Sequence, residues 1–129
     1  MLKGLQNSDN EELVKVSLIR ARMLSQFAVI VFGLKLESDY FLTGLFSSID
    51  VLLNESMEKV IARLPLTDAV KHALLGNGSD LRHVLNTILC FEKADWTCTD
   101  AFLAGYNLSH DTFMSLYLEA LRWERSLDT

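Results

Sequence analysis

The chain has 129 residues, half of them apolar, and a formal charge of −5. This length predicts one domain, residues 1–129, with enough apolar residues for a real core. The acidic balance argues against binding to nucleic acid or to an anionic membrane surface, because both attract basic patches and the Lys and Arg residues are scattered here. The longest mostly apolar run, around residues 27–34, is too short to cross a bilayer.

Helical periodicity predicts seven helices and no strand. The predicted ranges are 10–32, 39–53, 57–64, 68–75, 80–93, 99–104 and 110–127. The expected N-caps are Ser8 (with Glu11 as a capping box), Ser38, Ser56, Thr67, Ser79 and Ser109. Gly33 and Gly76 are expected to end the first and fourth helices, and Pro65 to stop the third. The prediction is an all-α fold, a compact bundle of about six to seven helices.

Two cysteines, Cys90 and Cys98, carry the information about redox environment. The N-terminus lacks the apolar core of a signal peptide, so we expect a reducing cytoplasm and free, buried or partly buried thiols. No Cys or His partner lies at the spacing typical of zinc sites. The sequence therefore predicts no metal site.

Four charged residues fall on or among apolar helix faces. Asp50 lies at the edge of the apolar face formed by residues 40–54, and Glu92 is the next member of the apolar stripe of residues 80–93. Arg20 lies on the apolar face of the first helix, and Arg22 lies on its opposite side. We expect a partly buried cluster in which Arg20 or Arg22 pairs with Asp50 and Glu92, because the planar guanidinium binds carboxylates by two hydrogen bonds.

This cluster has two interpretations. The favoured one is a framework of ion pairs that fixes helix register. The other is a site for an anionic ligand, and the carboxylates of Asp50 and Glu92 argue against it. In a buried cluster, Asp50→Ala is expected to destabilise the fold by about 3 kcal/mol. Trp96 is expected to cover the apolar end of the helix at residues 80–93. With Trp123 it could instead form an aromatic platform, which the packing interpretation makes unnecessary.

The dipeptide His110-Asp111 is the pair that holds metal in HD phosphohydrolases. A working site also needs a histidine and an aspartate that converge from other helices. Here the pair begins the last helix, where an acidic residue complements the helix dipole. His72 and His83 read as solvent-facing, and no serine or cysteine has the context of a nucleophile. We therefore expect no catalytic residue and no cofactor.

Five stretches together resemble one family. They are SLIRARMLSQFA (17–28), YFLTGLFSSIDVLL (40–53), LPLTDAVKHALLG (64–76), ILCFEKADW (88–96) and YLEALRW (117–123). In this order they are similar to the C-terminal half of an HDOD domain, the HD-related output domain of bacterial signalling proteins, above all of those that join an EAL domain to HDOD. The matching family positions are Arg20, Arg22, Gly44, Asp50, Glu92 and Trp96. The resemblance assigns none of them a catalytic role.

The resemblance implies an HD-like helical fold without catalysis. It implies a signalling module, related to cyclic di-GMP signalling. The module would relay a signal, through changes in helix packing, to an attached EAL domain, an N-terminal HDOD region or another protein. Those two regions are absent here, so we expect either an excised fragment or a naturally short relative. Apolar surface left uncovered would favour a homodimer, including one that exchanges helices. The alternatives are a remnant of a metal-dependent HD-type phosphohydrolase and a small-ligand sensor that uses the Arg/Asp/Glu cluster.

Overall fold

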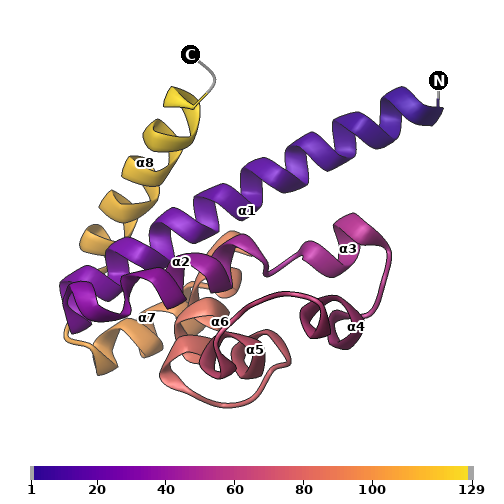
Figure 1. Ribbon diagram of the computed structural model, residues 1–129. Coiled ribbons are helices and arrows are strands. Elements are labelled where there is room, and N and C mark those ends of the chain that lie inside the picture. Colours follow the sequence, from indigo (N-terminus) through magenta and orange to yellow (C-terminus); the bar gives the residue numbers. More distant parts are fainter. Residues whose placement is uncertain (1, 128–129) are drawn as a thin grey trace.

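The computed structural model describes the backbone of residues 2–127 and the side chains of residues 10–127. Its elements are α1 (Leu2–Phe32), the 3₁₀ helix η1 (Leu34–Leu36), α2 (Glu37–Leu45), α3 (Ile49–Leu53), α4 (Met57–Ala62), α5 (Asp68–Leu74), α6 (Asp80–Glu92), α7 (Trp96–Gly105) and α8 (His110–Ser126). Residues 2–127 contain no strand, which confirms the all-α prediction (Figure 1). In that part of the chain no helix is both long and apolar enough to cross a bilayer.

Helix α1 is the central element of the bundle. Helices α2, α6 and α8 pack against it, and its N-terminal part extends beyond them (Figure 1). The buried part is its C-terminal half, where Leu24, Phe27 and Ala28 are fully covered. Ile30 in the same apolar stretch remains 51% exposed, so this end of the helix is only partly inside the core. The C-terminal half of the long helix therefore lies partly in the core, and its N-terminal part lies outside it (Figure 1).

The core forms where the apolar stripes of α6 and α8 meet α1. Its fully or nearly fully buried members include Met23, Leu24, Phe27, Val84, Leu85, Ile88, Leu103, Phe113 and Ala120. Phe91 lies at the edge of this core, with its ring centroid 5.1 Å from those of Phe113 and Tyr117 in edge-to-face contacts. Such contacts add specific geometry to the hydrophobic burial.

Four of the predicted N-caps are confirmed. The hydroxyls of Ser56, Thr67, Ser79 and Ser109 each accept a hydrogen bond from the backbone N–H three residues later. Gly33 and Gly76 adopt positive φ values of 86° and 91° after their helices, as a glycine C-cap does. These local signals depend on neighbouring residues alone, which is why the sequence is sufficient to predict them.

Three predicted helix starts were wrong. Helix α1 begins at Leu2, so Ser8 is an internal helix residue and not an N-cap. Helix α2 begins one residue before Ser38, with no side-chain cap. Helix α7 begins at Trp96 instead of residue 99, because the side chain of Asp95 caps it earlier.

The predicted helix over residues 39–53 is two helices, α2 and α3, separated by a turn at residues 46–48. In this turn the Ser47 hydroxyl donates a 2.7 Å hydrogen bond to the Gly44 carbonyl. The Ser47 and Ser48 hydroxyls also accept from Arg20. Serine side chains that bond to nearby groups compete with regular helix hydrogen bonds, and here they accompany the break.

Gly44 allows α2 to approach α1 closely. A Cβ built at Gly44 would lie 2.6 Å from the backbone Cα and N atoms of Ala21. Such a distance is far inside van der Waals contact, so no side chain fits there without moving the helices apart. The close approach brings the turn after α2 next to Arg20.

Candidate functional site

Arg20 is the centre of a polar junction between three segments. Its Nε and Nη2 atoms donate to the two carboxylate oxygens of Glu92, each at 2.7 Å. Its Nη1 donates to the hydroxyls of Ser48 at 2.7 Å and of Ser47 at 3.1 Å. The Arg20 and Glu92 side chains are 12% and 29% exposed. We call these four residues the Arg20 junction, and it joins α1, the α2–α3 turn and the end of α6.

The expected pairing of Arg20 with Glu92 is therefore present, but the expected inclusion of Asp50 was wrong. The Asp50 carboxylate makes no hydrogen bond or ion pair with any residue of the described part of the chain. The helix break places Asp50 in the first turn of α3, and serine hydroxyls occupy the position next to Arg20 that we assigned to its carboxylate. An acidic residue in a first helical turn complements the helix dipole.

Arg22, the alternative partner considered for these carboxylates, lies outside the junction. It binds Glu119 of α8, with 2.8 Å between Nη2 and Oε1 and 3.1 Å between Nε and Oε2. Its guanidinium carbon lies 5.4 Å from the ring centroid of Trp123, a cation–π contact. The hydrogen bond to Glu119 raises the pKa of Arg22. This α1–α8 pair is more open, with side chains 29% and 41% exposed.

Trp96 and His110 pack against each other where α7 meets the start of α8. The Trp96 ring lies 5.6 Å from the ring of Phe91 and 5.3 Å from that of His110, in edge-to-face contacts. Trp96 thus covers the end of α6, as expected, and remains 44% exposed. His110 Nδ1 lies 3.1 Å from Asp100 Oδ1. No group of three potential metal ligands in residues 10–127 includes His110 or Asp111.

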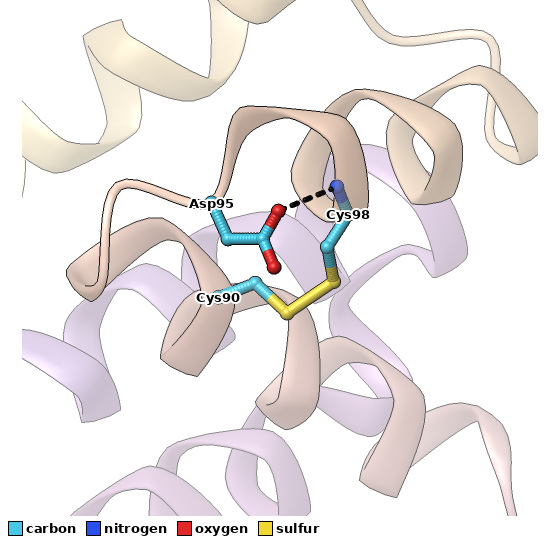
Figure 2. Close-up of side chains that lie close together, drawn as sticks. All are labelled: Cys90, Asp95 and Cys98. Atoms are coloured by element: carbon cyan, nitrogen blue, oxygen red, sulfur yellow. Dashed lines mark hydrogen bonds between the residues drawn. A yellow bond between two sulfur atoms is a disulfide. The ribbon is translucent and has the colours of Figure 1, made fainter.

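The two cysteines form a disulfide, so the prediction of free thiols was wrong. The bond joins Cys90 near the end of α6 to Cys98 in the first turn of α7, as Figure 2 shows. Ala94 adopts a left-handed φ of 58° between the helices, and this tight turn brings the two helix ends together. A spacing of eight residues gives no sign of this in the sequence, because it depends on where α6 stops and α7 starts.

Asp95 lies beside the disulfide. Its Oδ1 accepts a 3.1 Å hydrogen bond from the Cys98 amide, and ligand atoms of Cys90, Asp95 and Cys98 all lie within 4.8 Å of one another (Figure 2). Asp95 was not among the predicted metal ligands, because zinc spacing was judged from Cys and His alone. The geometry gathers two sulfur atoms and one oxygen at the exposed α6–α7 turn.

Glu124 is a second residue that the sequence analysis missed. It continues the apolar stripe of α8 and is 8% exposed, and its carboxylate has no hydrogen-bond or ion-pair partner in residues 10–127. It lines a hollow of about 590 Å³ where α1 and α8 diverge, together with Val14, Leu18 and Leu127. The same reasoning that identified Glu92 on its stripe would have identified Glu124.

Comparisons with known proteins find two relatives and no match among family models or solved structures. The chain is 35% identical over 122 residues to the uncharacterized protein YuxH of Bacillus subtilis, across 94% of this chain and 29% of that protein. It is 32% identical over 118 residues to the cyclic di-GMP phosphodiesterase CdgJ of Vibrio cholerae, across 92% of this chain and 27% of that protein. The chain thus spans less than a third of the length of either relative.

Proposed function

We propose that this chain is a non-catalytic, cytoplasmic signalling module of the HDOD type, which acts through protein contacts in cyclic di-GMP signalling. The similarity to CdgJ covers 92% of the chain, and CdgJ is named as a cyclic di-GMP phosphodiesterase. The five stretches that resemble HDOD occur along this chain in the family's order. The proposed partners are an EAL domain, an N-terminal HDOD region or another protein.

The observation that carries the proposal is that charged groups on apolar helix faces bind other helices of the bundle. All three nitrogen atoms of the Arg20 guanidinium donate to Glu92 or to the serine hydroxyls. Arg22 is likewise bound to Glu119. Few donors are left for an anionic ligand, which favours helix register over ligand sensing. A shift of α6 against α1 would break the hydrogen bonds of the Arg20 junction, so helix packing can relay a signal.

His110 distinguishes the proposal from the phosphohydrolase alternative. Its Nδ1 faces the Asp100 carboxylate of the neighbouring helix, which supports a structural task at the α7–α8 connection. The test is hydrolysis of cyclic di-GMP by the whole chain with Mg²⁺ or Mn²⁺ present. We expect no turnover. Turnover that His110→Ala abolishes would contradict the non-catalytic proposal.

We further propose that the module self-associates through the hollow between α1 and α8. Two large apolar residues that line it are well exposed, Val14 (43%) and Leu127 (52%), and Leu118 (44%) lines the adjoining hollow. Glu11 and Glu124 lie beside Lys15 in the same hollow, and Arg122 and Arg125 line the adjoining one. A surface that presents apolar side chains with both signs of charge can complement a second copy across a two-fold axis.

Sedimentation of the whole chain at about tens of micromolar tests this contact. We expect a dimer, and Val14→Glu is expected to shift it to monomer by placing a charge in the apolar contact. Leu75→Glu is the matched control, because Leu75 is 40% exposed and lies just after α5, outside this hollow. Monomer alone for the unmodified chain would contradict self-association. Equal effects of both substitutions would place the contact elsewhere.

A further inference from the structure

We propose that Cys90, Asp95 and Cys98 form a binding site for a thiophilic divalent metal ion of the zinc class when the disulfide is reduced. The inference does not depend on the proposed signalling function. Two thiolates and one carboxylate are a ligand set that Zn²⁺ accepts, with a fourth position open to water. The structure holds their ligand atoms within 4.8 Å of one another.

The backbone of the α6–α7 turn holds these three residues together by contacts other than the disulfide. Asp95 caps α7 through its Oδ1, and the Thr99 hydroxyl donates a 2.9 Å hydrogen bond to the Asp95 carbonyl. The amide of Asp95 donates a 2.9 Å hydrogen bond to the Cys90 carbonyl. Because these bonds do not involve sulfur, the turn can persist after reduction, and small side-chain rotations suffice to close on an ion with Zn–S distances of about 2.3 Å.

Metal binding requires that the Cys90–Cys98 disulfide is first reduced. A dithiol reductant transfers two electrons and two protons to the Cys90–Cys98 bond, which breaks to give two thiols while the reductant becomes a disulfide. Metal binding then displaces the two thiol protons. Cys98 is the third residue of α7, where the helix N-terminus favours the thiolate. Asp95 uses Oδ1 for its cap, which leaves Oδ2 for the metal.

The metal-bound and disulfide-bonded states exclude each other, because both use the same sulfur atoms. Either state ties α6 to α7 around a turn that begins after Glu92 and ends before Trp96, the first residue of α7. Only the reduced, metal-free state leaves the two sulfur atoms unlinked. The site thus makes the link between α6 and α7 depend on redox state and on metal supply.

The experiment uses the whole chain, reduced with a phosphine that is then removed without oxygen. Co²⁺ is titrated first as a spectroscopic probe, followed by Zn²⁺. We expect one Co²⁺ per reduced chain, with sulfur-to-cobalt charge-transfer bands that Zn²⁺ abolishes, and no such bands for the oxidised chain. Absence of charge-transfer bands in the reduced chain, or equal binding by the oxidised chain, would overturn the proposal.

Variants test the ligand set. Asp95→Asn keeps an N-cap of similar strength but removes the carboxylate, so Co²⁺ affinity is expected to fall at least about tenfold with helix content unchanged. His83→Ala is the control, because His83 lines a hollow beside Cys98 and is not one of the three grouped ligands. Its affinity should stay within about twofold, far from the loss expected for a ligand. Unchanged affinity in Asp95→Asn, or a tenfold loss in His83→Ala, would overturn the three-ligand site.

Discussion

Arg20 and Arg22 lie two residues apart on α1 and each binds a glutamate through Nε and Nη2, yet their surroundings differ. The Arg20 pair lies under two serine hydroxyls, with side chains 12% and 29% exposed. The Arg22 pair is 29% and 41% exposed and lies against Trp123. Since water screens exposed charges, the more buried pair should contribute more to the fold. The same residue type thus serves two tasks on opposite sides of one helix.

The largest expected effect comes from the close packing that forms the Arg20 side. Gly44→Ala should destabilise the protein by about 3 kcal/mol, because the added Cβ meets the α1 backbone and moves the serine turn away. Urea unfolding measures this. Gly105→Ala in α7 is the matched control, since nothing lies within 4 Å of its added Cβ. It should be neutral or slightly stabilising. Similar losses in both variants would refute the close approach of α2 to α1.

Removal of the Arg20 partner should come next. Glu92→Ala leaves the largely buried guanidinium with hydroxyl partners only, so we expect a loss of about 2–3 kcal/mol in the free energy of unfolding. Urea unfolding at low and high salt should give similar values, because the Arg20 side chain is only 12% exposed and its charge is screened little. A loss that vanishes in high salt would place Arg20 on the surface.

The Arg22 side should respond less. Glu119→Ala is expected to cost about 0.5–1 kcal/mol, the typical range for an exposed pair. Much of that loss should disappear at about 1 M salt, where the screening length is about 3 Å. Thermal unfolding across a salt series measures it. A loss as large as that of Glu92→Ala would show that the Arg22–Glu119 pair stabilises the fold as much as the Arg20–Glu92 pair.

Asp50→Ala should have the smallest effect, within about 0.5 kcal/mol, because the structure gives its carboxylate no partner in residues 10–127. A place for Asp50 in a buried cluster predicted a loss of about 3 kcal/mol. Urea unfolding separates the two values easily. A loss near about 3 kcal/mol would indicate that the Asp50 carboxylate pairs with Arg20.

Much of the fold follows from local sequence signals. The stripes of α6 and α8, and the N-caps at Ser56, Thr67, Ser79 and Ser109, depend on residues within a few positions of each other. The partnership of Arg20 with Glu92 was one of the two pairings that the sequence left open, because both charges lie on apolar faces that must meet in a core.

The rest depended on the tertiary arrangement and on turns that local sequence patterns do not mark. Asp50 was misplaced because the helix over residues 39–53 breaks at a serine turn that Arg20 itself binds. The choice between Arg20 and Arg22 stayed open because the partner of Arg22, Glu119, lies 97 positions away on α8. The Cys90–Cys98 pair depended on a left-handed Ala94 that nothing in the local sequence marks. Each error concerns a partner that only the tertiary arrangement selects.

The central claim is that the Arg20 junction fixes helix packing and that the Arg22 pair does so weakly. Two double-mutant cycles, Arg20→Ala with Glu92→Ala and Arg22→Ala with Glu119→Ala, measure both coupling energies by urea unfolding. We expect about 2 kcal/mol for the first pair and less than about 1 kcal/mol for the second. Equal coupling energies, or a larger value for Arg22 and Glu119, would contradict this account.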